Sequence, residues 1–317
     1  MMRLLLWFGC ICMSLLADAH IFVYHRFGDS RHQSTNVSIE VLKREFEYFK
    51  KNGYEVVSLS KLVKAIKDNK GIPDNWVVLT IDDSYKSFYD NGLPIFKAYG
   101  YPFTLFVYTK ATEAGYGDFM TWEQINEVKK YGELGFHSHT HPHMVSKSSK
   151  DLKKDFDTGI ELMQKRTGVK PRYFTYPYGE YDERIKNIAK EYGFEAIFNQ
   201  NVGAVSKFSD IFDIDRIALT DSTNLKSKLR VKFLSATWIE PKSYPKDGML
   251  KNIHIKIDTP VKAKKAQLYI TGLGWQWVDI KDNIVKIKID KPLKNRRNRL
   301  ILKLGNDKIS TKILVKP

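Results

Sequence analysis

Two different hydrophobic periodicities meet near residue 220, and they constrain the fold of this chain more than any other feature. From about residue 20 to 220, short apolar runs alternate with segments whose apolar residues recur at helical spacing. Repeated strand-then-helix units predict a parallel sheet covered by helices, which we expect to curl into a barrel. Beyond residue 221, apolar and polar residues alternate along five or more short segments. That pattern predicts a small antiparallel sandwich.

The expected elements of the first region follow one another closely. The expected strands are residues 21–24, 55–59, 76–81, 104–108, 134–136, 173–176 and 195–198, and the main expected helices are residues 38–52, 85–99, 121–131, 150–167 and 181–192. The run 76–81 is almost entirely apolar, as expected of a parallel strand that is buried on both faces. Polar residues that could carry chemistry come directly after strands, and barrel enzymes build their sites on that face.

The N-terminus has the pattern of a secretory signal peptide. Arg3 precedes an apolar stretch of residues 4–16, and Ala17-Asp18-Ala19 forms an A-x-A cleavage site. We expect cleavage after Ala19 and export to a periplasm or the cell exterior; an uncleaved membrane anchor is the alternative. The domain prediction is therefore a signal peptide at 1–19, a catalytic domain at 20–221 and a basic β domain at 222–317. The cysteines, Cys10 and Cys12, both lie in the segment that cleavage would remove, so we expect no disulfide framework.

The charge of the chain is concentrated in its last third. Residues 221–317 contain 23 Lys and Arg against 8 Asp and Glu, a balance of +15 out of a total of +16. Such asymmetry suggests an anionic partner, such as membrane lipid, lipopolysaccharide or an acidic polymer. The alternative is a lysine-rich solvated surface that keeps the strand edges unpaired. We expect no nucleic-acid partner.

Two short segments carry the strongest chemical signal. The sequence TIDDS at residues 80–84 ends a buried run with two adjacent carboxylates, and HSHTHPH at residues 137–143 contains four histidines. One carboxylate and two imidazoles commonly hold a hydrolytic metal ion, which leaves the second carboxylate free to act as a base. His137 and His141 are four residues apart, but so are His139 and His143, and spacing does not choose between the pairs. The structural alternatives are an Asp-Asp turn that caps a helix and a surface loop that binds metal adventitiously.

Three motifs in this order give the chain a family resemblance. TIDDS at 80–84 resembles the T-F-D-D-G motif of the polysaccharide deacetylases, the NodB-homology group of carbohydrate esterase family 4. ELGFHSHTHP at 133–142 resembles their E-I-G-x-H-[ST]-x-[ST]-H-P motif, and FTYPYG at 174–179 resembles F-R-x-P-Y-G. The resemblance covers about residues 20–220. It implies a distorted (β/α) barrel and a metal-dependent enzyme that removes N-acetyl groups from an N-acetylglucosamine polysaccharide and releases acetate.

The resemblance also implies roles for individual residues. Asp82 would be the general base, and Asp83, His137 and His141 would hold the metal. That metal is usually Zn²⁺ in this family, with Ni²⁺ or Co²⁺ as substitutes. The backbone N–H of Tyr178 would help to bind the oxyanion. The metal would acidify water and polarise the carbonyl group.

Ile81 and Ser84 replace the Phe and Gly of the first motif, which looks tolerable, and two further departures from the family pattern bear on catalysis. Thr175 occupies a position where many members have an arginine that orients the base, and we expect Arg216 to supply that charge.

The usual late L-x-H motif, whose histidine is the general acid, is absent. The one histidine after His143 is His254, which lies in the predicted β domain. His25 follows the first strand in VYHRF, which resembles the Y-H segment of biofilm poly-N-acetylglucosamine deacetylases. We therefore expect His25 to be the acid.

These observations favour an exported poly-N-acetylglucosamine deacetylase. The alternatives are a peptidoglycan or chitin-oligomer deacetylase with the same chemistry, and an inactive carbohydrate-binding envelope protein. Trp275 and Trp277 alternate on a predicted strand. They could stack on sugar rings, but we expect them to belong to the core of the sandwich.

Overall fold

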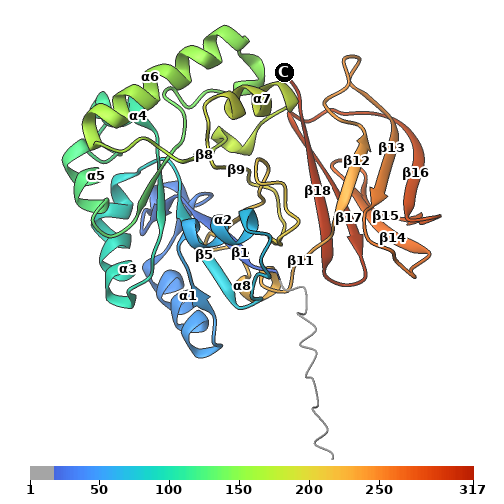
Figure 1. Cartoon of the computed structure of the whole chain (residues 1–317), viewed down its shortest axis with the longest axis horizontal. Coiled ribbons are helices and arrows are strands. Elements are labelled where there is room, and N and C mark those ends of the chain that lie inside the picture. Colours follow the sequence, from blue (N-terminus) through green and yellow to red (C-terminus); the bar gives the residue numbers. More distant parts are fainter. Residues whose placement is uncertain (1–17) are drawn as a thin grey trace, which may run out of the picture.

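A computed structural model describes residues 18–317, which form a barrel-like lobe and a strand-rich lobe side by side (Figure 1). The sheet of the first lobe is parallel throughout. Its strands, in spatial order, are β10 (Ile217–Ala218), β1 (His20–Tyr24), β5 (Trp76–Ile81), β6 (Thr104–Val107), β7 (Glu133–Phe136), β8 (Tyr173–Thr175) and β9 (Ala196–Phe198), with β4 (Glu55–Val56) also paired to β5. Strands β2 (Arg26–Phe27) and β3 (Asn36–Val37) form a separate pair.

Helices occupy the connections between these strands. They are α1 (Ile39–Lys51), α2 (Leu59–Lys67), α3 (Leu93–Tyr99), α4 (Thr109–Glu113), α5 (Trp122–Val128), α6 (Ser149–Thr167) and α7 (Glu183–Glu191), and short helical turns lie at Ser30–His32, Met144–Ser146 and Pro177–Gly179. Side chains at the N-termini satisfy free backbone N–H groups: Ser148 caps α6, Asp182 caps α7, and Thr121 forms a reciprocal capping box with Gln124 on α5.

An irregular segment joins the two edges of the sheet. Ile214 forms a parallel bridge with Phe198 of β9, and four residues later Ala218 of β10 pairs with Val23 of β1. The sheet therefore closes into a distorted barrel through the residues between Ile211 and Ala218. Arg216 lies inside this closing segment, so its position depends on the closure of the barrel.

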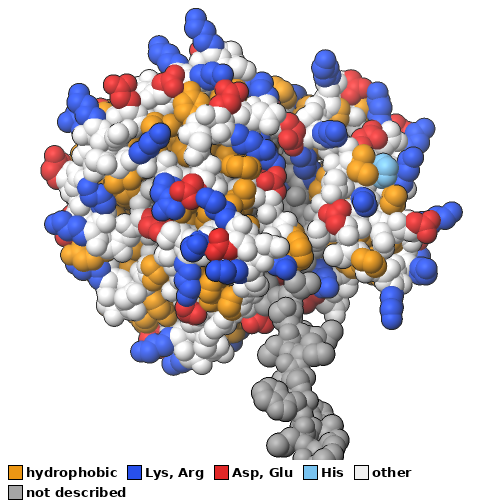
Figure 2. Space-filling model, in the orientation of Figure 1, with side chains coloured by type: hydrophobic (Ala, Val, Ile, Leu, Met, Phe, Trp, Pro, Cys, Tyr) orange, Lys and Arg blue, Asp and Glu red, His pale blue; other side chains and the backbone are white. Residues whose placement is uncertain are grey.

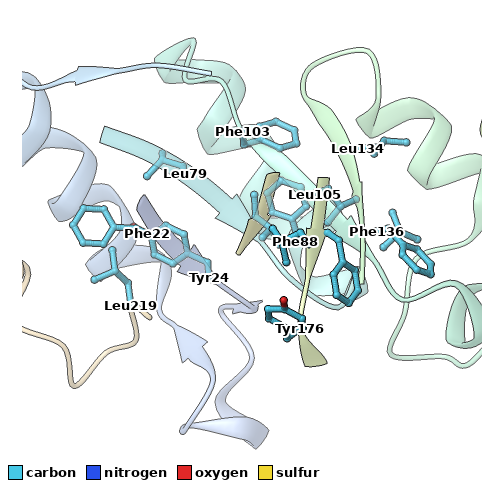
Figure 3. Close-up of a cluster of buried hydrophobic side chains, with 14 of the residues drawn as sticks. Phe22, Tyr24, Leu79, Phe88, Phe103, Leu105, Leu134, Phe136, Tyr176 and Leu219 are labelled. Atoms are coloured by element: carbon cyan, nitrogen blue, oxygen red, sulfur yellow. The ribbon is translucent and has the colours of Figure 1, made fainter. Parts of the chain in front are cut away.

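The barrel strands are buried on both faces. Phe22, Leu79 and Leu105 belong to a large core cluster that also contains side chains from α1, α3, α5 and α6 (Figure 3). Their neighbours Ile21 and Val78 belong to a second cluster that includes α2. Because alternate side chains enter two different cores, these strands have continuous apolar sequences rather than alternating ones.

The second lobe is a sandwich of two sheets. The larger sheet has the order β11 (Lys232–Phe233), β18 (Lys308–Val315), β17 (Arg297–Leu304), β14 (Lys265–Ile270) and β15 (Gly274–Asp279), and the smaller one has β12 (Ala236–Glu240), β13 (Met249–Ile257) and β16 (Ile284–Pro292). All pairs are antiparallel except β11 with β18. A third apolar cluster, including Ile255, Leu268 and Leu302, lies between the sheets. Helix α8 (Leu225–Lys228) precedes β11.

The two lobes are joined by apolar and polar contacts of β18 and by a contact of the residue that precedes β11 (Figure 1). Ile313 and Val315 of β18 belong to the large core cluster of the barrel. The Thr311 hydroxyl donates to the Val202 carbonyl at 2.7 Å, and His20 Nε2 lies 2.9 Å from the Val231 carbonyl oxygen. Among residues 18–317, none of the helices is both long and apolar enough to cross a bilayer.

The helix expected at 85–99 is confirmed over residues 86–99, with a π-helical turn at Phe88–Gly92 that leads directly into α3. The expectation for the two tryptophans was wrong. Trp275 and Trp277 do not enter the sandwich core, since 50% and 66% of their surfaces are exposed. Their strand, β15, points Val278 inward and both tryptophans outward.

Candidate metal and catalytic site

The polar residues singled out from the sequence converge at the C-terminal ends of the barrel strands. Asp82 and Asp83 directly follow β5, His137 follows β7, and Tyr178 lies three residues after β8. Parallel strands end at the same edge of a sheet, and for that reason segments about fifty residues apart meet there.

Three side chains form a compact set of metal ligands. Asp83 Oδ1 lies 3.2 Å from His137 Nε2 and 3.1 Å from His141 Nε2, and the two Nε2 atoms are 3.2 Å apart. Ligands that share one ion at bond lengths of about 2.0–2.2 Å are separated by about 3.3 Å. Asp83 Oδ1 is buried and makes no hydrogen bond within residues 18–317. A buried oxygen without a donor, facing two ring nitrogens, fits a cation-binding site.

Contacts of Nδ1, the ring nitrogen that does not face Asp83, fix the orientation of His137. Its Nδ1 lies 2.6 Å from the Thr175 hydroxyl and 3.0 Å from the Thr175 carbonyl oxygen. A proton on Nδ1 can be donated to that carbonyl, which leaves Nε2 free to coordinate a metal. Thr175 thus contacts a ligand histidine and does not contact Asp82 within hydrogen-bonding distance, although it occupies the position at which the family pattern has an arginine.

The other two histidines of the cluster make different contacts. His139 Nδ1 lies 3.0 Å from the Thr109 hydroxyl, and His143 Nδ1 lies 2.8 Å from Glu180 Oε2. Neither belongs to the group of converging ligand atoms. Of the two pairs that the spacing left open, the structure brings His137 and His141 together with Asp83.

Asp82 is held by a buried bidentate ion pair. Arg216 Nη1 and Nη2 donate to the two carboxylate oxygens at 2.8 and 2.7 Å, and both side chains are 0% exposed. The guanidinium also donates to the Asn199 carbonyl and the Thr80 hydroxyl. Burial opposes ionisation of Asp82, but the charge and hydrogen bonds of Arg216, together with His137 and His25, outweigh it and hold the pKa of this carboxyl below its usual value. Asp82 therefore stays ionised at neutral pH.

His25 lies on the same edge of the barrel and is connected to Asp82 through Gln200. The Gln200 amide nitrogen lies 3.3 Å from His25 Nε2 and 3.4 Å from Asp82 Oδ2. Burial lowers the pKa of His25, and the nearby carboxylates Asp83 and Asp82 oppose that shift. The structure thus brings His25 beside the carboxylate pair, fifty-seven residues away in the sequence.

Tyr178 lies in a strained turn at the rim of the site. Its φ angle is +58°, and its ring stacks on His143 at 4.2 Å and meets His141 edge-on at 4.5 Å between centroids. Gly179 follows with a φ of +65°, and a Cβ atom there would lie 2.8 Å from Gln200 Cβ. The turn therefore requires glycine both for its backbone angle and for the close approach of Gln200.

Backbone strain is concentrated at the site. Nine non-glycine residues in the described chain have positive φ angles, and five of them are in the three site segments: Asp83, Ser84, Ser138, His141 and Tyr178. Each such residue costs on the order of 1–3 kcal/mol and persists only where the surrounding structure enforces it. Clustering of this strain around the ligand set is typical of a functional site.

Sequence reasoning missed several residues at the rim. Gln200 follows β9 in a segment with no recognisable motif. Glu180 is 1% exposed and faces His143, Arg296 and Arg297, and the two arginines come from the second lobe. A pattern of sequence letters could not have paired residues more than one hundred positions apart.

Comparison with known proteins agrees with this geometry. Residues 69–197 match the family model described as polysaccharide deacetylase. The poly-beta-1,6-N-acetyl-D-glucosamine N-deacetylase of Escherichia coli K12 is 25% identical over 240 residues, which cover 62% of this chain and 35% of that protein. The chain therefore spans about a third of the length of that relative. The Staphylococcus aureus N315 protein of the same name is 24% identical over 213 residues, which cover 63% of this chain and 73% of that one.

Comparison with solved structures agrees with the sequence comparisons. The Streptococcus pyogenes deacetylase PplD, solved in complex with acetate, superposes with a TM-score of 0.60 at 23% identity and covers 65% of this chain and 94% of its own. This likeness confirms the prediction of a distorted (β/α) barrel.

Proposed function

We propose that this chain, whose residues 69–197 match the polysaccharide deacetylase family model, hydrolyses N-acetyl groups of an N-acetylglucosamine polysaccharide and releases acetate. Poly-N-acetylglucosamine is the proposed polymer. Two kinds of observation support it: the names of the relatives described above, and the position of His25 early in the chain at the same rim as Asp82. The observation that carries the proposal is the convergence of Asp83, His137 and His141 beside a second carboxylate that a buried arginine keeps ionised.

Asp83, His137 and His141 would hold a divalent ion, with Zn²⁺ proposed ahead of Ni²⁺ and Co²⁺. One carboxylate and two imidazoles suit zinc, and the remaining positions would be open to solvent and substrate. When bound, the ion would acidify a water molecule and polarise the amide carbonyl.

The protein's own residues would manage the protons. Asp82 accepts a proton from the attacking water. Arg216 binds both carboxylate oxygens of Asp82, which keeps the lone pair that accepts this proton in one orientation. The C–N bond of the amide then breaks, and the leaving nitrogen takes a proton from His25, which must be in its imidazolium form, a state that the neighbouring carboxylates Asp83 and Asp82 favour against burial. Gln200, within 3.4 Å of both groups, would keep base and acid at a constant separation.

The turn at Tyr178 would stabilise the developing negative charge. We propose that its backbone N–H points to the carbonyl oxygen of the acetyl group, as the left-handed conformation and the packed ring favour. Removing one such donor typically lowers the rate about 10²–10³-fold.

Export and surface contact are also part of the proposal. Residues 1–17 lie outside the described residues, so the signal peptide is supported by sequence alone. Cleavage after Ala19 would remove the backbone pairing of Ala19 with Val205 and the bond from the Phe233 N–H to Asp18. N-terminal sequencing of the exported protein would locate the cleavage site. Lys and Arg side chains project from the second lobe (Figure 2), and salt-dependent binding to anionic vesicles would test an envelope contact.

Acetate release is the decisive test of the function. The full chain would be incubated with poly-N-acetylglucosamine, chitin oligomers and peptidoglycan, with and without added Zn²⁺, and Asp82→Asn would serve as the inactive control. We expect zinc-dependent release that is greatest with poly-N-acetylglucosamine and falls at least about 10³-fold in the variant. Acetate release from peptidoglycan alone would show that peptidoglycan is the substrate instead. Stoichiometric zinc binding without release from any polymer would instead indicate an inactive binding protein.

A further inference from the structure

The outer face of β14 and β15 presents an aromatic surface. Tyr269, Trp275 and Trp277 point away from the sandwich core, and Tyr269 pairs with Trp275 across the two strands at 5.4 Å between ring centroids. Trp275 and Trp277, two positions apart on β15, are separated by about 6.8 Å along the strand. Half or more of each tryptophan is exposed. Such exposure leaves a large apolar area in water, which soluble proteins commonly reserve for binding.

This aromatic face continues into a groove between the two lobes. The groove has a volume of about 840 Å³, and Trp275, Ile301 and Lys303 line it from the sandwich while Val202 lines it from the barrel lobe. Lys303 Nζ lies 5.8 Å from the Trp275 ring centroid. The surface thus combines flat aromatic rings, an adjoining groove and a fixed positive charge.

We propose that this aromatic face binds the still-acetylated polysaccharide. Sugar rings expose flat C–H faces that can stack on tryptophan, and N-acetylglucosamine units carry no charge. Each deacetylated unit carries an ammonium group, which the groove would repel because its lining has four basic residues, Lys303 and Arg230 among them, against one acidic residue, Asp307. The face would therefore retain substrate and release product. This inference rests on the proposed deacetylase function and adds to it a site for the polymer away from the metal ligands.

Polymer binding by the full chain tests this proposal. The Asp82→Asn background keeps the polymer acetylated during the measurement, and migration in gels that contain acetylated poly-N-acetylglucosamine reports affinity. We expect Trp275→Ala/Trp277→Ala to weaken retention about tenfold or more. Leu273→Ala is the matched control, because Leu273 is an exposed apolar residue in the turn between the same two strands, and it should bind like the parent.

Gels with other polymers distinguish the possible ligands. Weak retention by chemically deacetylated polymer would support the proposal, whereas equal or stronger retention would overturn it. Retention by heparin that depends on the tryptophans and exceeds retention by the acetylated polymer would assign the face to an anionic ligand instead. Unchanged binding of the double variant to the acetylated polymer would also overturn it.

Turnover of short chitin oligomers separates this proposal from the function itself. Acetate release from oligomers by the unmodified chain, without retention of the polymer, would overturn the aromatic binding site and support the deacetylase function. Retention of the polymer without acetate release from any substrate would support the binding site and overturn the deacetylase function.

A second, independent observation concerns the contacts that Arg296, at the end of the β16–β17 connection, and Arg297, the first residue of β17, make near the Tyr178 turn. Arg297 Nη1 donates to the Tyr178 carbonyl at 3.3 Å. Arg296 Nε lies 3.4 Å from both carboxylate oxygens of the buried Glu180, and Arg296 Nη2 donates to the Ser146 hydroxyl at 3.2 Å. A buried carboxylate requires cationic or hydrogen-bonding partners, and here two of them come from the second lobe.

We infer that Arg297 is a positioning residue for the Tyr178 turn. The turn has a left-handed tyrosine that needs external support, and Arg297 holds the carbonyl of that same residue. The second lobe would therefore influence the rate of deacetylation without touching the substrate. This inference also rests on the proposed function.

Three variants test this role on short oligomers. We expect Arg297→Ala to lower kcat about tenfold with KM, bound zinc and Tm unchanged, and Arg297→Lys to recover part of the loss. Lys294→Ala, which removes an exposed positive charge from the same connection, should be neutral. Equal losses in Arg297→Ala and Lys294→Ala, a fall in bound zinc, or an unchanged kcat would each overturn the inference. If no variant or parent releases acetate, the proposed function fails instead.

Discussion

The ligand site of the barrel and the aromatic face of the sandwich are built in opposite ways. The ligand site assembles buried, charged side chains from separate strand ends, and it holds five non-glycine residues at positive φ. The aromatic face uses neighbours on two adjacent strands, with regular pairing and exposed rings. The difference suggests that chemistry at the barrel depends on precise, costly placement, whereas recognition on the sandwich depends on surface area. Substitutions should therefore have large effects at the first region and graded effects at the second.

The largest effect is expected for a ligand histidine. His137→Ala removes a buried ring whose Nε2 is 3.2 Å from Asp83 Oδ1, so zinc binding and acetate release should both fall at least about 10³-fold. Zinc content by mass spectrometry and acetate release check this. His139→Ala is the matched control, because its ring contacts Thr109 instead, and similar losses in both variants would contradict the assignment of ligands.

A somewhat smaller effect is expected at the ion pair behind the base. Arg216→Met leaves the buried Asp82 carboxylate without its partner, which should destabilise the protein by about 3–5 kcal/mol and lower kcat. Chemical denaturation and acetate release measure the two effects. Arg44→Ala, at an exposed position on α1, should change neither. Unchanged turnover in a folded Arg216→Met protein would remove Arg216 from the proposed mechanism.

The turn that carries Tyr178 should be sensitive to one methyl group. Gly179→Ala combines a φ of +65° with a Cβ atom 2.8 Å from Gln200 Cβ, whereas Gly53→Ala has a φ of +71° and open space. Both should be destabilised by about 1 kcal/mol through the backbone. Only Gly179→Ala should also lose activity, by about tenfold. Equal activity in the two variants would show that contact with Gln200 is unimportant for catalysis.

The effect expected to change activity least is a dependence of barrel stability on pH. Burial raises the pKa of Glu45 from 4.5 to about 7, while a hydrogen bond from the Tyr24 hydroxyl at 2.7 Å opposes the shift. Because the folded protein binds this proton more tightly than the unfolded chain, its contribution to stability is complete below about pH 4.5. That contribution, about 3 kcal/mol at most, is lost as the pH rises through about 7.

Denaturation at several pH values compares Glu45→Gln with the exposed Glu40→Gln on the same helix. Glu45→Gln should remove this part of the pH dependence, and Glu40→Gln should retain it. Since Glu45 is buried on α1 and contacts Tyr24 of β1, this measurement reports on burial in the lobe that holds the site. Identical pH profiles for the two variants would contradict the raised pKa.

Much of the barrel could be predicted because its signals are local. The apolar run at Trp76–Ile81 is buried on both faces in the structure, and the paired motifs placed Asp82, Asp83 and the histidine cluster after their strands. Irregular local geometry was not predictable in the same way. The π-helical turn at Phe88–Gly92 and the outward tryptophans depend on packing that a period of two or 3.6 does not encode, because either face of an edge strand can be the exposed one.

By itself, the sequence determined the two-lobe architecture, the order of elements and the identity of the chemical groups. Hydrophobic period and residue type are properties of short segments, and these conclusions required nothing more. The tertiary structure decided which two of the four histidines meet Asp83, that Gln200 lies between Asp82 and His25, and that Arg297 contacts the Tyr178 carbonyl. Those pairings depend on barrel closure and lobe docking, which bring together residues that no local pattern relates.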